Sequence, residues 1–386
     1  MNSHFAARLC LLVGGLLSGA TPVAVTQNGD LVPDYRSQDL VISWNNAHSF
    51  TRTDEGILLV YQKNGWVMAR RWSSEGQHIE RLLSSGQARA VALASSLEKD
   101  FLLALWVERK GLLSAFSKDQ GRTWSSPREM VRGPIQAPVG RVWMEGDTPQ
   151  ALVLYHTGNR ESGQVWSVRM DGTNWSVPVR VDLGSGSFVT LAGEGSTSLA
   201  VWKDFRRGGR SAVLYQREYR NGGWGAERAT GIEGADPSLG CSSEGHYWMG
   251  FQRFRRIWST RSEDGGRTWK RPRRIPGVEG LFAHVACDSE NRVAMAFERF
   301  LSAGDFRDDS VKGIGLVTSV DGGHRLDLAD LAEKKASQIR SLVELSADGR
   351  MDLVWVDRSG PSSRIRWSAL RLDLPPGRAP GVDSSR

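Results

Sequence analysis

The chain has 386 residues and a formal net charge of +7, and 40% of its residues are hydrophobic, which is enough for a packed core. With 15 Trp and 43 Gly, the composition is typical of many short strands joined by tight turns. The basic residues are mostly Arg and are spread along the chain, so we expect no nucleic-acid partner.

The N-terminus predicts an export signal. Arg8 precedes an apolar stretch at residues 9–17, and Ser18 and Ala20 supply small residues at the −3 and −1 positions of a cleavage site. The stretch is too short to span a membrane, and no later segment reaches 18 apolar residues. We therefore predict a signal peptide at 1–20, a secreted or periplasmic protein without a membrane span, and one domain over 21–374.

Short apolar runs that close with an aromatic residue repeat along the chain. The closing aromatics are Tyr61, Trp106, Tyr155, Trp202, Phe251, Phe297 and Trp355, at steps of 45 to 58 residues. A period of this length, with several strands in each unit, indicates an all-β fold, a β-propeller of four-stranded blades. Seven blades are favoured and six remain possible. A second series, Trp124, Trp175, Trp224 and Trp269, places a large ring at a regular site between blades.

Three further segments bear on the ends of the ring. Residues 37–45 read as an N-terminal strand that completes the last sheet and so closes the propeller. Residues 326–337, rich in Ala, Glu and Lys, predict a short helix between units six and seven. Residues 375–386, rich in Pro, Gly and Ser, predict a disordered tail.

The turns before two of these Trp residues share one motif. Residues 117–124 read SKDQGRTW and residues 262–269 read SEDGGRTW, while residues 319–324, SVDGGH, keep only its first half. In such a turn an Asp carboxylate caps backbone N–H groups and a Gly accepts a positive φ. The structural residues are therefore predicted to be Asp119, Gly121, Trp124, Asp264, Gly266, Trp269 and Asp321.

This motif resembles the Asp box, or BNR repeat, of the sialidase superfamily, and the resemblance covers residues from about 40 to 372. It implies a β-propeller whose Asp boxes lie on the face opposite the ligand site. It also implies, for an enzyme, a sialidase-like glycoside hydrolase with an Arg triad and a late Tyr nucleophile. Here the last Tyr is Tyr247, and the Arg-Ile-Pro at 274–276 falls in an outer strand, so the sialidase mechanism is hard to assemble.

The predicted ligand face lies where the second strand of each unit ends. Two residues past the closing aromatics stand Lys63, Glu108, Thr157, Asp204, Arg253, Arg299 and Asp357. Arg beside Phe recurs there in three successive units, so we predict a site for an anionic ligand, a glycan or a protein. Its residues are Arg109, Arg206, Arg253, Arg255, Arg299, Arg358, Phe205 and Phe254. The alternative is that these polar residues only end strands at the water surface.

Two function classes stay open. The first, which we favour, is a non-catalytic carbohydrate-binding propeller. The second is an exo-sialidase or another glycoside hydrolase or lyase, with Asp204, Glu108 and Asp357 as acid/base candidates. We expect no cofactor and no metal, and we expect the protein to be a monomer.

Two cysteines follow the predicted signal. Cys241 and Cys287 each stand ten residues before the closing aromatic of their unit, which places them in the same register of adjacent blades. Inner strands approach one another near the axis, so a disulfide between them is predicted; two small buried thiols are the alternative.

Overall fold

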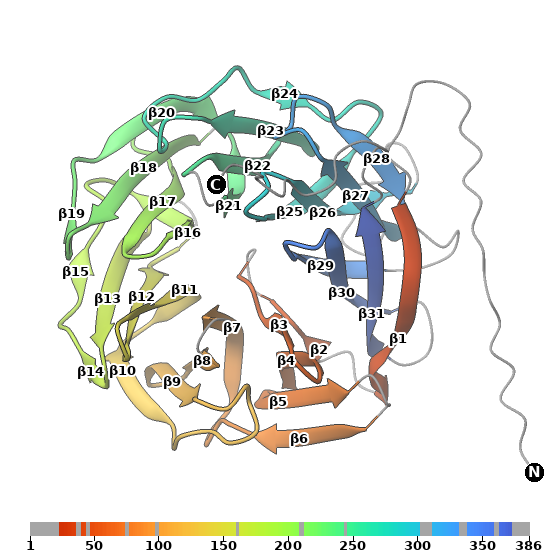
Figure 1. Ribbon diagram of the computed structural model, residues 1–386. Coiled ribbons are helices and arrows are strands. Elements are labelled where there is room, and N and C mark those ends of the chain that lie inside the picture. The colour runs from red at the N-terminus through yellow and green to blue at the C-terminus, as the bar shows by residue number, and fades with distance from the viewer. Residues whose placement is uncertain are drawn as a thin grey trace, which may run out of the picture.

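Seven β-sheets surround a central axis in the computed structural model of the chain (Figure 1). The structure describes residues 23–35, 40–43, 47–73, 77–96, 100–159, 162–207, 212–242, 245–301, 311–331, 338–358 and 363–372. Within these ranges there is no α-helix, and hence no apolar helix that could cross a membrane. The predicted all-β propeller of four-stranded blades is confirmed, with seven blades.

Each blade is an antiparallel sheet that begins at the axis with an inner strand and ends at the rim (Figure 1). Blade 1 consists of β2 (Leu40–Val41), β3 (Phe50–Thr53), β4 (Gly56–Lys63), β5 (Trp66–Ser73) and β6 (His78–Leu82). Blade 2 consists of β7 (Ala88–Ser96), β8 (Phe101–Glu108), β9 (Gly111–Ser117) and β10 (Arg128–Arg132). Blade 3 consists of β11 (Ile135–Glu145), β12 (Thr148–Thr157), β13 (Gln164–Asp171), β14 (Asn174–Trp175) and β15 (Val179–Arg180). Blade 4 consists of β16 (Gly186–Glu194), β17 (Thr197–Asp204), β18 (Val213–Arg220), β19 (Gly223–Trp224) and β20 (Arg228–Glu233).

The remaining three blades follow the same order. Blade 5 consists of β21 (Ala235–Cys241), β22 (Tyr247–Arg253), β23 (Arg256–Ser262) and β24 (Arg273–Arg274). Blade 6 consists of β25 (Gly280–Cys287), β26 (Val293–Phe300), β27 (Lys312–Ser319) and β28 (Asp327–Asp330). Blade 7 consists of β29 (Gln338–Leu345), β30 (Arg350–Asp357), β31 (Ser363–Leu372) and β1 (Val23–Tyr35).

An N-terminal strand closes the ring, as predicted, but it is β1 and not residues 37–45. β1 lies beside β31 in Figure 1 and pairs with it antiparallel, from Val23 opposite Leu372 to Tyr35 opposite Ser363. Residues 40–41 instead form β2, the start of the inner strand of blade 1. The prediction chose the wrong strand because a rim strand such as β1 is largely exposed and needs no apolar run. The apolar residues 40 and 42 instead belong at the axis.

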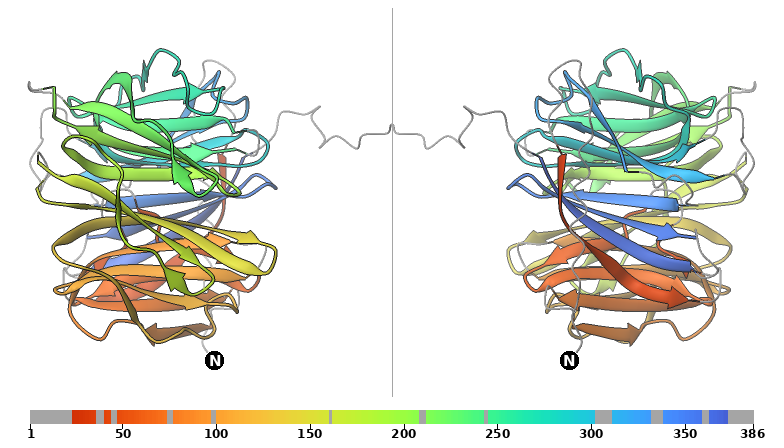
Figure 2. Two further views of the ribbon diagram at one scale, coloured as in Figure 1. Left: turned by 90° about the vertical axis from the view of Figure 1, so that its left-hand side faces the viewer. Right: turned by 90° about the vertical axis from the view of Figure 1, so that its right-hand side faces the viewer.

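The apolar core lies between blades rather than within them. The second strand of each blade is buried along nearly its whole length, as in β8 and β17. Each core cluster joins two or more neighbouring blades, for example Leu58 and Val60 of blade 1 with Ala104 and Trp106 of blade 2. Because no blade can bury its faces alone, the ring is stable only as a whole. Figure 2 shows the blades from the side, stacked around the ring.

Two of the regular Trp residues hydrogen-bond to the blade before their own. The indole of Trp224 in blade 4 donates to the hydroxyl of Ser167 in blade 3 at 3.0 Å. The indole of Trp269 in blade 5 donates to Gln216 in blade 4 at 2.7 Å. The predicted place of these rings, between neighbouring blades, agrees with these contacts.

The turns that the sequence interprets as Asp boxes are held by their aspartates. The Asp264 carboxylate accepts hydrogen bonds from the backbone N–H of Thr268 at 2.9 Å and from its hydroxyl at 2.6 Å. The Ser262 hydroxyl donates to Asp264 at 2.7 Å and accepts the N–H of Gly266 at 2.9 Å. The turns that begin at Ser117 and Ser319 repeat the serine contacts.

A glycine in each of these turns seats it against the preceding blade. Gly121, Gly266 and Gly323 have φ values of 81°, 83° and 76°, where a side chain is strained. A Cβ atom at Gly266 would also press on Leu199 of blade 4, and one at Gly323 would overlap the ring of Trp248 in blade 5. The turn therefore serves both its own hairpin and the contact between blades.

Other predictions meet the structure in part or lie outside it. The segment 326–337, predicted as a helix, contains the rim strand β28, which pairs with β27 through Leu328 opposite Val317. The helical composition was misleading because a rim strand is exposed and needs few β-branched residues. The predicted signal peptide at 1–20, the predicted tail at 375–386 and residues 332–337 lie outside the described residues.

We expect Asp264→Ala to lower the free energy of unfolding by about 2 kcal/mol, because Thr268 and Ser262 lose a charged acceptor. Urea unfolding followed by Trp fluorescence measures the change. Glu290→Ala, which removes an exposed carboxylate, is the matched control. Equal midpoints for the two variants would contradict a folding role for Asp264.

Candidate functional site

The ring has two chemically different ends. The residues that follow the second strands lie at the end where inner strands begin, as the pairs Gly186 with Asp204 and Gly280 with Arg299 show. The Asp-box turns begin at the other end, where Cys241, Tyr247 and Ser262 pair in one row. We call the first end, where the sequence predicts the ligand site, the ligand face, and the second, after the motif that its turns resemble, the Asp-box end.

On the ligand face, Arg206 and Asp204 belong to an ion-pair network inside blade 4. Arg206 donates to Asp204 at 2.7 Å and also to Glu227, and its guanidinium lies 4.1 Å from the centre of the Tyr215 ring. Asp204 is buried and also accepts the backbone N–H of Arg206 at 2.8 Å. With both charges matched within the protein, these contacts favour a folding role for the pair.

The other two acid/base candidates are also engaged by the protein. The buried carboxylate of Asp357 lies 3.7 Å from Arg364 and 3.6 Å from Arg366. Glu108 accepts the indole N–H of Trp106 at 2.9 Å. A glycoside hydrolase needs two carboxyl groups that face the substrate, and these contacts do not favour that role.

Blade 5 carries the most exposed part of the predicted site. Phe254 and Arg255 form the two-residue turn between β22 and β23, with φ values of 50° and 57°. Phe254 is 73% exposed, and Arg253 beside it pairs with Glu233 at 2.8 Å and lies 5.6 Å from the Phe254 ring centre. The remaining predicted residues lie apart: Arg109 in the turn after β8, Phe205 just after β17, Arg299 on β26 and Arg358 just after β30.

The turn at Phe254 conflicts with local backbone preference. Two positive φ values are what Asn-Gly supplies most easily in a two-residue hairpin. Blade 1 uses Asn64 and Gly65, with φ values of 51° and 80°, for the equivalent turn after β4. Blade 5 holds a bulky aromatic and an Arg in that conformation and leaves the ring in water, so neither turn propensity nor packing explains Phe254.

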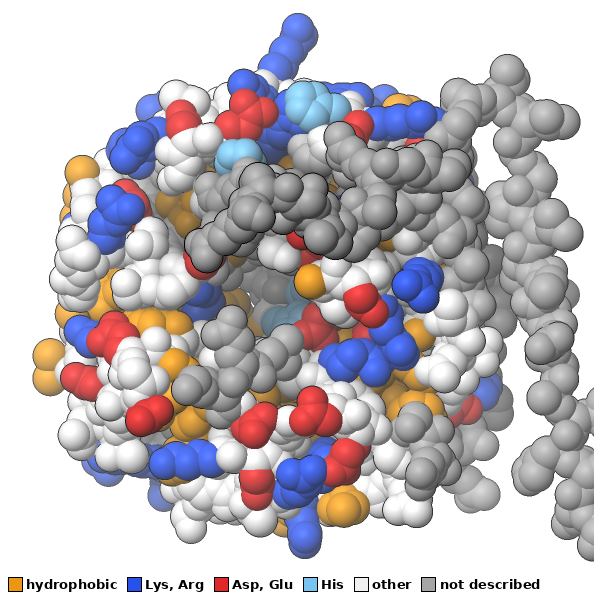
Figure 3. All heavy atoms as spheres, in the orientation of Figure 1, with side chains coloured by type: hydrophobic (Ala, Val, Ile, Leu, Met, Phe, Trp, Pro, Cys, Tyr) orange, Lys and Arg blue, Asp and Glu red, His pale blue; other side chains and the backbone are white. Residues whose placement is uncertain are grey.

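Sequence reasoning missed a cavity of about 310 Å³ on the axis, which opens as the hollow at the centre of the ring in Figure 3. Five inner strands line it, β11, β16, β21, β25 and β29, together with Ala47 and His48 of blade 1. Its lining extends to Cys241, Cys287 and Leu345, which are the last residues of their strands. The cavity therefore occupies the half of the axis nearer the Asp-box end.

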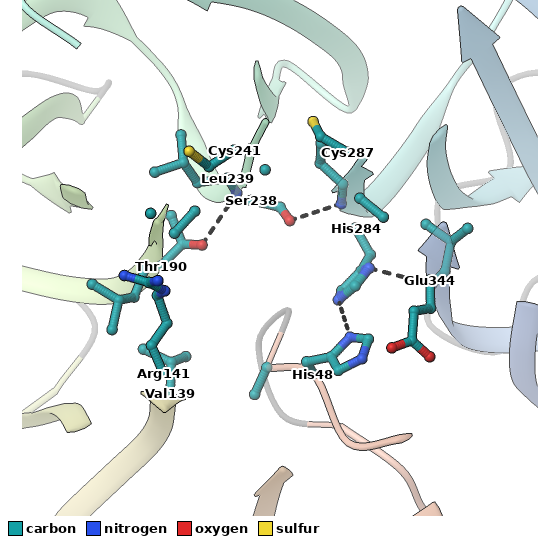
Figure 4. A pocket seen from close by; sticks show the side chains of 18 of the residues that line it. His48, Val139, Arg141, Thr190, Ser238, Leu239, Cys241, His284, Cys287 and Glu344 are labelled. Carbon is teal, nitrogen blue, oxygen red and sulfur yellow. Dashed lines mark hydrogen bonds between the residues drawn. The ribbon is translucent and has the colours of Figure 1, made fainter. Parts of the chain in front are cut away.

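Two rows of residues face this cavity, because side chains alternate along each inner strand. The first row consists of Val139, Thr190, Ser238 and His284. The second row lies two residues further along the strands and consists of Arg141, Ala192, Gly240, Ala286 and Glu344. Most of the second row is small, and this leaves room between Arg141 and Glu344 on opposite sides of the cavity (Figure 4).

Members of the first row link neighbouring inner strands. Thr190 accepts the backbone N–H of Leu239 at 3.2 Å, and Ser238 accepts that of Val285 at 2.9 Å. His284 Nδ1 accepts the N–H of Val343 at 3.3 Å. Each bond crosses from one blade to the next. The hydroxyl hydrogens of Thr190 and Ser238 are not consumed in these bonds, so both groups can still donate.

A pair of neutral histidines forms one wall. His284 Nε2 and His48 Nδ1 lie 3.4 Å apart, at hydrogen-bond distance (Figure 4), and a hydrogen on His284 Nε2 is the arrangement that agrees with Nδ1 accepting the N–H of Val343. Burial lowers the pKa of His48 to about 4 and lowers the pKa of His284 well below its usual value. Both rings are therefore neutral at pH 7.

Glu344 lies beside the histidines. Its carboxyl group accepts the hydroxyl of Thr51 at 2.8 Å and the backbone N–H of Arg52 at 2.9 Å. Burial raises the pKa of Glu344 to about 7. This group can therefore change its charge near neutral pH.

Arg141 faces Glu344 across the cavity (Figure 4). Its Nη1 donates to the carbonyl of Thr197 at 2.8 Å and to Ser198 at 2.5 Å, and its Nη2 to the carbonyl of Gly195 at 3.4 Å. No Asp or Glu of the described residues lies within ion-pair distance of it. Burial lowers the pKa of Arg141, which marks a cation taken partly out of water without a counter-ion.

The predicted disulfide is absent from the structure, where Cys241 and Cys287 are free thiols. They do share one register in adjacent inner strands, opposite Tyr247 and Val293. The Cys241 thiol donates to the carbonyl of Ser242 at 3.2 Å, while the Cys287 sulfur packs beside Gly240. Burial raises the pKa of Cys241 to about 11 and that of Cys287 well above its usual value.

Three comparisons place the fold among known proteins. No protein-family model and no curated protein matches the sequence. An ulvan lyase of family PL25, solved with bound -[GlcA(1-4)Rha3S]-, superposes with a TM-score of 0.61 at 9% identity, over 88% of this chain and 95% of that one. The Aleuria aurantia lectin with α-methyl-L-fucoside gives 0.51 at 10% identity, over 75% and 96%. Trypanosoma rangeli sialidase with sialic acid gives 0.48 at 14% identity, over 84% and 60%.

At these identities the likeness concerns the fold. The predicted β-propeller fold is confirmed, since the chain forms a ring of seven blades and superposes on other propeller proteins with TM-scores above 0.5. Among the described residues no three His, Cys, Asp or Glu side chains gather as a metal site would require.

The pKa of Glu344 predicts a pH dependence of stability. Its folded value of about 7 exceeds the unfolded value of 4.5, so the folded state binds a proton that the unfolded state releases between these pH values. The contribution of Glu344 is greatest below pH 4.5 and is lost as pH rises to about 7. As pH rises from 4.5 to 8, we expect the free energy of unfolding of the Glu344→Gln variant to increase by on the order of 2–3 kcal/mol relative to that of the native chain.

Urea unfolding at fixed pH values measures this difference. The pKa values of His48 and His284 are lowered, so the stability that these residues contribute is lost as pH falls below 6.5. This loss occurs in both proteins and cancels in the difference between them. A constant difference between the two proteins from pH 4.5 to 8 would show that Glu344 is ionised throughout.

Proposed function

We propose that the protein is an exported, non-catalytic propeller that binds an anionic glycan on its ligand face. The observation that carries the proposal is the turn at Phe254, an exposed aromatic held in a strained conformation between two Arg residues. An aromatic face suits a sugar ring, and Arg forks suit carboxylate or sulfate groups. In the next blade Phe300 follows Arg299 in the sequence, but there the Phe ring is buried.

Fold likeness supports a carbohydrate ligand. The ulvan lyase and the lectin superpose on this fold, and the ligand described for the lyase contains glucuronate and a sulfated rhamnose, both anionic. The contacts of Asp204, Asp357 and Glu108 favour binding over hydrolysis, because the protein already engages all three carboxylates. A lyase or hydrolase with other catalytic groups is the alternative.

We expect Arg253→Ala to weaken binding of an immobilised acidic oligosaccharide about tenfold or more, since a charge-assisted contact contributes about 1.5–3 kcal/mol. The half-exposed pair with Glu233 contributes little to stability, so the melting temperature should stay nearly unchanged. Biolayer interferometry after a glycan-array screen gives the affinity. Arg267→Ala, in an Asp-box turn at the other end, is the control.

Three results would oppose this proposal. An acidic glycan panel without a hit would remove the ligand class. Loss of binding in the Arg267→Ala variant, with Arg253→Ala unaffected, would move the site to the other end of the ring. Cleavage of an acidic oligosaccharide that stops in Asp204→Ala would establish the enzyme alternative.

A second prediction separates function from folding at the Phe254 turn. Replacing Phe254 and Arg255 by the Asn-Gly of the blade 1 turn should stabilise the protein by about 1 kcal/mol, because two positive φ values become unstrained. The same change should weaken glycan binding at least tenfold. Urea unfolding and the binding assay measure the two effects. A variant that binds as tightly as the native chain would show that the turn is not part of the site.

A further inference from the structure

The axial cavity has the chemistry of a second site, at the other end from the proposed glycan face. We propose that it binds a small hydroxylated carboxylate of monosaccharide size, with the carboxylate on Arg141. Its volume of about 310 Å³ lies at the lower end of the roughly 300–1,000 Å³ typical of small-molecule sites. That space exceeds what a single ordered water needs and suffices for one sugar ring.

Arg141 keeps the right donors for a carboxylate. Its three described hydrogen bonds use both hydrogens of Nη1 and one of Nη2. The Nε–H has no acceptor among the described residues, and Nη2 makes one bond, of 3.4 Å, for its two hydrogens. These two groups form one edge of the guanidinium, and Arg52 uses the same edge to hold Asp352 with bonds of 2.6 and 2.7 Å. A two-point contact of this kind is specific for a planar oxyanion.

The three anchoring bonds also hold the guanidinium in place. They tie Arg141 of blade 3 to the β16–β17 hairpin of blade 4, so little side-chain entropy remains to be lost on binding. A fixed, partly desolvated cation with no carboxylate of the described residues at ion-pair distance is expensive to keep, since the charge of Glu194 offsets only part of the effect of burial, and an anion from solvent would complete it. The neighbouring residues Ala192, Gly240 and Ala286 in the same row leave the space for that anion.

The rest of the cavity lining suits hydroxyl groups. Thr190 and Ser238 retain a hydrogen to donate, and Glu344 can accept or donate according to its protonation. The His48 and His284 pair is neutral and adds no competing charge. A sugar acid could place its carboxylate on Arg141 and its hydroxyl groups toward Glu344. A simple anion would bind Arg141 alone and leave Thr190, Ser238 and Glu344 without a ligand group.

Isothermal titration of the mature chain with D-glucuronate tests the proposal, with D-glucose as the neutral match. We expect glucuronate to bind and glucose to bind at least tenfold more weakly. Arg141→Gln should reduce glucuronate affinity at least tenfold. Arg271→Gln, which changes an exposed rim Arg outside both sites, should bind glucuronate like the native chain.

Because Arg141 also links two blades, its variant is checked by thermal melting. Ala286→Met fills the cavity without removing a hydrogen bond and should likewise abolish glucuronate binding. The proposal is overturned if the native chain binds neither compound, if glucose binds as well as glucuronate, or if folded Arg141→Gln and Ala286→Met variants bind normally. Loss of glucuronate binding only in Arg253→Ala would assign the sugar acid to the ligand face and leave the cavity without this role.

Discussion

The hydrogen bond that the backbone of an inner strand donates to a side chain of the preceding blade is the constraint on which the arrangement of blades 4 to 7 at the axis depends. Thr190, Ser238 and His284 each accept an N–H of the following inner strand, and so fix the distance between blades at the axis. A wider or narrower spacing would break either these bonds or the packing between second strands. The same bonds set the tautomer of His284 and hold the second row of side chains at a common level. The cavity is thus a by-product of how the blades are joined.

The sequence was informative where a constraint repeats in every blade. Buried second strands ending in an aromatic, such as Trp106 and Trp202, must recur at a near-constant interval, and their count predicted seven blades. Rim strands carry no such constraint, which is why β1 was overlooked and β28 was taken for a helix. Their pairing is decided by backbone hydrogen bonds that any exposed sequence can make.

The candidate sites were predictable to different degrees for a similar reason. Residues after a closing aromatic, such as Arg253 and Phe254, can be found by counting from the aromatic. Arg141 and Glu344 cannot, because the hairpin before the second strand varies in length and each inner strand contains a bulge. The bulge places residues with positive φ, among them Phe188 and Phe282, opposite the closing aromatic and shifts all later positions. Only the assembled sheet shows that Arg141 and Glu344 stand at one level.

The pairing of β1 with β31 also determines when the ring can close during folding. Val23 pairs with Leu372, so the first strand of the ring to be synthesised must wait for the last one. Until then blade 7 lacks its rim strand and two blade faces stay open to water. Contacts so distant in sequence form slowly, and the waiting intermediate exposes apolar surface. The chain therefore needs protection from aggregation for the whole of its synthesis, and a ribosome that stalls before β31 would release a protein unable to close.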